Sequence, residues 1–130
     1  MAITLVGLGG CSEKRSQPLA IDNSLTQEEI AAGVLSPEVM WKMGRVGLAS
    51  LSPDASRLLY TVTWYNMQEN RGVTAIYVRD AASGEVAQLT DFSSNNSDPK
   101  WNADGSKIYF LSDLSGSCLL YTSDAADDLL

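Results

Sequence analysis

The sequence predicts an all-β protein whose sheets repeat along the chain, and two observations support this. The first is a repeated turn, because Ser52–Tyr60 (SPDASRLLY) returns about fifty residues later as Asn102–Phe110 (NADGSKIYF). Each copy carries an Asp, a small residue, a Ser and a cation ahead of an apolar strand. The second is the β-branched and aromatic content between the two turns. A period of about fifty residues with such content indicates an array in which each repeat is one sheet.

The segments around and between the turns fit the four strands of one sheet. The first strand begins at Val46, and three more are expected over Leu58–Trp64, Val73–Val78 and Val86–Leu89. The polar loop Thr90–Pro99 follows, and Lys100 opens the next sheet. Because both faces of Leu58–Trp64 are apolar or β-branched, this sheet should be covered on both sides. We therefore expect a partial β-propeller over 46–117, with about one complete four-stranded blade and the start of a second.

The repeat singles out three turn residues, Asp54, Asp104 and Gly105. We expect each Asp to cap backbone N–H groups of its own turn. Metal ligation is the alternative, but neither Asp has a neighbouring carboxylate at a ligand spacing, and no metal site or cofactor is predicted. The first turn has Ala55 where the second has Gly105. If this position needs a positive φ, Ala55 costs about 1 kcal/mol there.

Two short helices are expected within residues 25–45. Thr26 and Glu29 have the spacing of a capping box, and Gly33 ends that helix. The second helix starts after Ser36 and ends at Gly44. Its apolar face is formed by Val39, Met40 and Met43. We interpret Trp41 in this helix as a packing residue rather than as a platform for a ligand.

Residues 1–10 are small and apolar, and Leu8–Cys11 resembles a bacterial lipobox. In this interpretation residues 1–10 are the remnant of a lipoprotein signal whose start lies upstream. Cys11 then carries the lipid, and 11–24 is a flexible tether. The protein would be a periplasmic or outer-membrane-associated lipoprotein, held on a membrane through the lipid alone. The alternative is an ordinary buried Cys near a strand at Ile3–Val6.

The repeated turn resembles the TolB-type propeller repeat, which reads roughly Trp-Ser-Pro-Asp-Gly-Lys before an apolar strand. Leu35–Val46 (LSPEVMWKMGRV), with the first turn and Tyr60–Thr63, resembles the start of bacterial dipeptidyl and acylaminoacyl peptidases of the prolyl oligopeptidase family. The resemblance covers roughly residues 25–117. It implies the amino-terminal propeller of a periplasmic or surface serine peptidase, which gates and positions short peptides over a separate catalytic domain. The catalytic residues would then lie beyond residue 130.

Composition excludes several functions for these 130 residues. There is no His and no Gly-x-Ser-x-Gly, so a Ser-His-Asp triad cannot be assembled and no catalytic residue is predicted. The net charge of -7 gives no electrostatic support for nucleic-acid binding. Glu28–Glu29 fits a helix start better than a peptide-binding pair, and 91–98 fits a solvated loop better than a cation site. The alternative function is a non-catalytic periplasmic TolB-like propeller that binds a protein or a glycan.

Past Gly116 the strand pattern breaks. Cys118–Leu130 resembles the translation of a transposase-type sequencing adapter, and we interpret 118–130 as a non-native tail outside the fold. Cys11 and Cys118 are therefore not expected to form a disulfide.

The expected sheet leaves apolar faces uncovered, with Leu58, Tyr60 and Val62 on one face and Leu59 and Tyr77 on the other. Burying a large apolar side chain contributes roughly 1.5–3 kcal/mol, so exposing half a dozen forfeits about 10 kcal/mol. The expectation is that the chain does not form a cooperative monomer, and that the strand edge after Leu111 associates with other chains.

Lipidation of Cys11 is directly testable in bacterial cells fed a palmitate analogue. The wild-type chain should incorporate label and Cys11→Ala should not, because only the thiol at the cleavage site accepts the lipid. Equal labelling of both chains would contradict the assignment.

Overall fold

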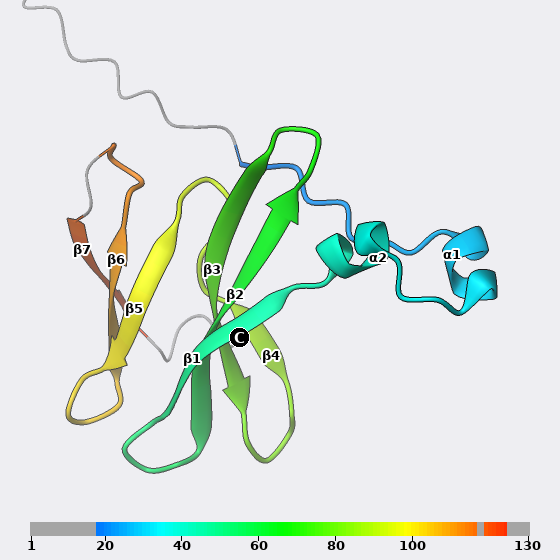
Figure 1. The fold of residues 1–130 in the computed structure, drawn as a ribbon. Coiled ribbons are helices and arrows are strands. Elements are labelled where there is room, and N and C mark those ends of the chain that lie inside the picture. Colours follow the sequence, from blue (N-terminus) through cyan, green and yellow to red (C-terminus); the bar gives the residue numbers. More distant parts are fainter. Residues whose placement is uncertain (1–17, 117–118, 125–130) are drawn as a thin grey trace, which may run out of the picture.

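The computed structural model describes residues 18–116 and 119–124 (Figure 1). Sheet 1 contains β1 (Arg45–Leu51), β2 (Arg57–Asn66), β3 (Arg71–Asp80) and β4 (Val86–Gln88), paired in that order. Sheet 2 contains β5 (Asn96–Trp101), β6 (Lys107–Ser112) and β7 (Leu119–Asp124). All pairings are antiparallel. Two short helices, α1 (Gln27–Ala32) and α2 (Pro37–Lys42), precede the strands. The described part is mostly β, in agreement with the predicted all-β class.

The four predicted strands of the first sheet are confirmed, and β2 and β3 are longer than expected. The long β2–β3 ladder runs from Arg57 opposite Asp80 to Asn66 opposite Arg71. Two sheets do not close a propeller, so that part of the expectation stays a prediction.

Sheet 2 differs from the prediction at both of its ends. β5 begins at Asn96, inside the segment expected to be a loop, because its polar residues pair with β6 on either side of a bulge. The six residues Leu119–Asp124, expected to lie outside the fold, form β7 and pair along the whole of β6. The paired strands therefore extend past residue 117, while the non-native origin of 118–130 stays a prediction. The edge of β6 that was expected to be open is covered by β7.

The helix signals are confirmed. Thr26 and Glu29 form the predicted capping box, with Thr26 N donating to Glu29 Oε2 at 2.8 Å and Glu29 N donating to Thr26 Oγ1 at 3.2 Å. Gly33 ends α1 with a φ of 59°. Ser36 caps α2, whose C-cap is Met43 rather than Gly44.

The predicted apolar face of α2 is only partly buried. Val39 is buried, whereas Met40 and Met43 are exposed. A Cβ at Gly44 would lie 2.7 Å from side-chain atoms of Val62 and Trp64, so the chain passes directly over β2 at this point. Gly44 is therefore required for close approach to the sheet, and the residues leading into β1 cover the Val62 end of that face.

The hydrophobic core lies between the two sheets. Leu59, Ile76 and Val78 from sheet 1 pack against Ile108 and Phe110 from sheet 2. The expected pairing of Leu59 with Tyr77 on one face is wrong. Tyr77 lies opposite Tyr60 in the ladder and stacks on it at 5.7 Å, because the register sets Leu59 opposite Val78.

The other face of sheet 1 is covered only at one end. Val62, Val73 and Ala75 are buried there, beneath Gly44 and α2. At the end near the repeated turns the face is open, and apolar side chains lie on all four strands. We call this the open face of sheet 1; it comprises Leu51, Leu58, Tyr60, Tyr77 and Val86, with the exposed Arg79 between Leu58 and Val86.

The two repeated turns have the same backbone hydrogen bonds. Ser52 N donates to Arg57 O at 2.8 Å, and Asn102 N donates to Lys107 O at 2.9 Å. The fourth position of each repeat has a positive φ, 59° at Ala55 and 76° at Gly105. The strained conformation anticipated for Ala55 is therefore present.

The turns also contact each other. Gly105 is buried, and a Cβ there would lie 3.1 Å from Pro53 Cδ. Arg57 donates from Nη2 to Gly105 O at 2.9 Å and lies 5.1 Å over the ring of Trp101. The repeat therefore places its own cation and its own aromatic residue at the interface between the sheets.

A polar cluster lies at the far end of the same inter-sheet interface. Asn96 is 1% exposed, and its Nδ2 donates to Thr74 O on β3 at 3.2 Å. Ser112 Oγ donates to Ser94 Oγ at 3.1 Å. Buried amides and hydroxyls need partners, so the bond from Asn96 to β3 favours one relative position of the two sheets, while the Ser112–Ser94 bond lies on the side of sheet 2.

The two turns give a matched pair of substitutions. Gly105→Ala should lower the free energy of unfolding by at least about 1 kcal/mol, because Ala is strained at positive φ and its Cβ approaches Pro53. Ala55→Gly relieves the same strain, but Gly also increases the conformational entropy of the unfolded chain, which costs roughly 0.4–1 kcal/mol of stability. Because the two effects oppose each other, the free energy of unfolding should stay close to that of the wild type. Urea unfolding at one fixed protein concentration measures both. Equal stability of Gly105→Ala and the wild type would contradict the comparison.

Candidate functional site

A cavity of about 660 Å³ lies where residues 20–23, α2 and the β2–β3 turn meet. Its lining combines aromatic rings, carboxylates and amides: Asp22, Glu38, Trp41, Tyr65, Asn66 and Gln68. We call it the helix–hairpin cavity. The segments that line it lie at the end of sheet 1 away from the repeated turns; Figure 1 shows α2 and the tip of the β2–β3 hairpin there.

One wall of the cavity is an aromatic pair that holds a cation. The rings of Trp41 and Tyr65 meet edge to face at 5.1 Å. The Arg45 guanidinium lies 4.4 Å from the Trp41 centroid and 4.5 Å from the Tyr65 centroid. Such contacts are worth about 0.5–1 kcal/mol each at exposed sites. Trp41 is therefore a packing residue, as predicted, and the same packing holds it as a wall of the cavity.

Hydrogen bonds from the amino-terminal segment shape the opposite wall. Asn66 Nδ2 donates to Ala20 O at 2.7 Å, and Asn66 Oδ1 accepts from Glu69 N at 2.9 Å. Asn23 Oδ1 is buried and has no hydrogen-bond partner among the described residues. An acceptor in that state favours a donor from a ligand or from water.

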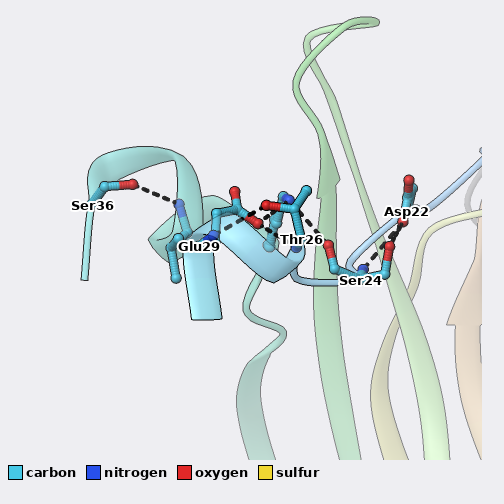
Figure 2. A network of polar contacts seen from close by, with 7 residues as sticks. Asp22, Ser24, Thr26, Glu29 and Ser36 are labelled. Atoms are coloured by element: carbon cyan, nitrogen blue, oxygen red, sulfur yellow. Dashed lines mark hydrogen bonds and ion pairs between the residues drawn. The ribbon is translucent and has the colours of Figure 1, made fainter. Parts of the chain in front are cut away.

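A polar network connects both helices to this segment (Figure 2). Lys42 Nζ lies 2.7 Å from Glu29 Oε2 and donates to Ser24 O at 3.0 Å. Ser24 donates to Asp22 Oδ1 from its backbone N at 3.1 Å and from Oγ at 2.6 Å. The single carboxylate of Glu29 thus caps α1 and binds the last turn of α2.

The charged side chains that line the cavity carry a net negative charge. Hydrogen bonds from Ser24 lower the pKa of Asp22, and the backbone N–H of Glu38 together with Ser36 lowers the pKa of Glu38. Lys42 is already paired with Glu29, and the ion pair lowers the pKa of that carboxyl as well. Asp22 and Glu38 therefore remain ionised into the acid range and favour a ligand with a cationic group or N–H donors.

The predicted turn residues lie at the other end of sheet 1. Asp54 Oδ1 accepts from Ser52 Oγ at 2.5 Å and from Ser56 N at 3.1 Å, and these hydrogen bonds lower the pKa of Asp54 to about 2. Asp104 Oδ1 accepts from Ser106 N at 2.7 Å. These contacts are those of a turn cap. The turns and the cavity are separate features of the fold.

Some of the remaining predicted features lie outside the described residues. Cys11 lies outside the described residues, as do the first part of its tether and Cys118. In the loop before β5, Asp91 accepts from Ser93 N at 2.9 Å. No group of three metal-ligating side chains occurs among residues 18–116 and 119–124. None of the helices described here is long and apolar enough to span a membrane.

Several cavity residues were missed by sequence reasoning. The contact of Trp41 with Arg45 has no helical-spacing signal, because α2 ends at Lys42 and Arg45 is the first residue of β1. Asp22, Tyr65 and Asn66 carry no such signal, because tertiary folding alone brings them to the cavity.

Comparison with known proteins gives two relatives, while no protein-family profile matches the chain. The chain is 32% identical to dipeptidyl-peptidase 5 of Porphyromonas endodontalis over 100 residues, and 33% identical to dipeptidyl-peptidase 5 of Porphyromonas gingivalis over 86. These matches cover 76% and 66% of this chain. The chain is related to part of a dipeptidyl peptidase. It spans about 14% and 13% of the length of these two relatives. The predicted resemblance to peptidases is thereby confirmed as a relation to part of a dipeptidyl peptidase.

The Glu29–Lys42 pair gives a prediction about pH. The folded-state pKa of Glu29 is lowered from 4.5, so this carboxylate stabilises the fold above pH 4.5 and loses its effect as the pH falls through the folded pKa. Glu29→Gln should melt at a lower temperature than the wild type at neutral pH. The difference should shrink well below pH 4.5.

Thermal melts followed by circular dichroism across this range measure the effect. Glu28→Gln is the matched control, an exposed position on the same helix with no ion pair among the described residues. If the two variants melt alike at neutral pH, the ion pair does not stabilise the helices.

Proposed function

We propose that this chain is part of a serine peptidase of the dipeptidyl-peptidase type, and that its sheets contribute to a propeller that admits and positions short peptides. The observation that carries the proposal is the 32–33% identity to two dipeptidyl peptidases over most of this chain. The chain holds no His and no nucleophile elbow, so the nucleophile, acid and base belong to other parts of the full-length protein.

The arrangement of the sheets supports a propeller. Sheet 1 is a four-stranded antiparallel meander in sequence order, and sheet 2 packs face to face on it. The repeated turn joins the first two strands of each sheet in the same way, β1 to β2 and β5 to β6. A sheet that is apolar on both faces fits a position between two neighbouring sheets.

The helix–hairpin cavity supports the positioning of peptides. Its carboxylates, Asp22 and Glu38, favour the ammonium group at the amino end of a short peptide. The ring of Tyr65 and the amide of Gln68 provide a surface for the peptide beyond that group. We place the protein in the periplasm or at the outer membrane, anchored through Cys11.

The full-length gene provides the test. A reading frame that continues to Gly-x-Ser-x-Gly, followed by Asp and His, should encode a protein that releases dipeptides from a fluorogenic dipeptidyl amide. Replacing the Ser of that motif with Ala should abolish release, and residues 1–130 alone should release none. A frame without the motif, or a full-length protein without this activity, would overturn the proposal and favour a non-catalytic binding propeller.

Within the full-length enzyme the cavity has its own prediction. Asp22→Asn combined with Glu38→Gln should raise KM several-fold and leave kcat nearly unchanged, because these carboxylates contact the bound peptide and not the reacting bond. Glu28→Gln is the control and should alter neither constant. An unchanged KM would separate the cavity from peptide binding while leaving the peptidase assignment intact.

A further inference from the structure

Asp22, one of the two carboxylates of the helix–hairpin cavity, lies in a short coil that is tied to the fold at both ends. Upstream, Asn66 Nδ2 donates to Ala20 O at 2.7 Å, which joins the coil to the end of β2. Downstream, Lys42 Nζ donates to Ser24 O at 3.0 Å, which joins the coil to the last turn of α2. Asp22 lies between these two ties, so its position depends on both of them.

Ser24 connects the downstream tie to the carboxylate (Figure 2). Its backbone N donates to Asp22 Oδ1 at 3.1 Å, and its Oγ donates to the same oxygen at 2.6 Å. Both bonds use one oxygen, so they orient the carboxylate and leave Oδ2 without a hydrogen bond among the described residues. Oδ2 is therefore the oxygen through which Asp22 can bind a ligand in the cavity.

Packing does not hold the helix that follows this coil. No residue of α1 is buried, so α1 has no apolar anchor among the described residues. Its one ion pair there joins Glu29 Oε2 to Lys42 Nζ at 2.7 Å. The two side chains are only 23% and 25% exposed, so salt screens this pair less than a fully exposed one. Lys42 thus holds both the coil and the helix after it.

We propose that Lys42 is a positioning residue of the helix–hairpin cavity, and that it keeps the carboxylate of Asp22 in place for a bound peptide by binding Ser24 O and Glu29. The inference rests on the proposed function of the cavity in peptide binding. Lys42 acts through Asp22 and does not bind the peptide itself, because its ammonium group already has two acceptors.

The charge of Lys42 gives the proposal a definite sign. Lys42→Met removes a cation from the cavity lining and leaves Glu29 unpaired, so the charge change alone would attract a cationic ligand and lower KM. Loss of the tie at Ser24 O acts in the opposite direction, because a mobile carboxylate must be ordered when the peptide binds. A rise in KM therefore reports positioning rather than charge.

Glu38, the other carboxylate of the cavity, allows the path of the effect to be tested. It lies in the first turn of α2, where its own backbone N–H and Ser36 hold it, whereas the ion pair of Lys42 is with Glu29. The effect of Lys42→Met should therefore disappear in a chain that already carries Asp22→Asn. It should persist in a chain that carries Glu38→Gln, because independent sites add in their free energies.

Steady-state kinetics of the full-length enzyme with a fluorogenic dipeptidyl amide provide the test. Lys42→Met should raise KM several-fold and leave kcat nearly unchanged. Lys42→Arg keeps the charge and the donors, so it should recover part of the loss. Lys100→Met is the matched control, because it also removes the cation of an ion pair, with Asp98 on β5, and should alter neither constant.

Circular dichroism melts show whether each variant is folded. Ser24→Ala removes the Oγ bond to Asp22 and should raise KM in the same direction, so it replaces Lys42→Met if that chain does not fold. An unchanged or lowered KM would overturn the proposal, as expected if other parts of the full-length protein hold the coil. Equal rises in the Asp22→Asn and Glu38→Gln backgrounds would also overturn it, because the lysine would then act on the whole fold.

Asp22→Asn alone separates this proposal from the function on which it rests. If Asp22→Asn raises KM and Lys42→Met does not, the positioning role is wrong and the peptide site stands. If Asp22→Asn leaves KM unchanged, this carboxylate does not bind the peptide, and the positioning role is overturned with it.

Discussion

The packing of Leu59, Ile76 and Val78 against Ile108 and Phe110 is the contact on which the rest of the described structure depends. Each sheet alone is a small antiparallel meander with two faces in water, and such units are marginal without a partner surface. Once the sheets meet, Trp101 and Tyr121 cover the margins of the contact, and Arg57 connects the two turns. The order of the strands follows the order of the chain because each strand pairs antiparallel with the one before it in its sheet, which a short connection allows.

The local features of this fold could be predicted well from the sequence, and the pairing of its strands less well. Helix caps and turns are set by neighbours within a few residues, so the caps made by Thr26 and Asp54 and the start of α2 after Ser36 were predicted from the sequence. The polar start of β5 and the late strand β7 were missed, because the ladder with β6 holds them in place and their own composition does not. The face of Tyr77 was assigned wrongly for the same reason, since a register shift of one residue reverses every side chain of a strand.

The helix–hairpin cavity could be only partly foreseen. Trp41 was predicted to be a packing residue, but its contact with Arg45 does not follow from helical spacing, because α2 ends at Lys42 and Arg45 begins β1. Tyr65 reaches the same guanidinium from the end of β2. The carboxylate of Asp22 comes from a coil and that of Glu38 from the first turn of α2, and no sequence pattern links the two residues. Their convergence depends on Lys42, which holds Glu29 and Ser24 together and so fixes the segment that carries Asp22. In this protein, one lysine organises the acidic side of the cavity without contributing a free charge to it.

The contact between the sheets is apolar near the repeated turns and hydrogen-bonded at the end that contains Asn96, Ser94 and Ser112. These two ends should tolerate change differently during evolution. Aliphatic residues such as Leu59 and Ile108 can be exchanged for others of similar volume with modest loss, since apolar packing has no required direction. Asn96 has no such substitutes, because each of its bonds depends on an amide of that length and orientation. Descendants of this sequence should therefore vary their apolar pairs freely and retain the asparagine.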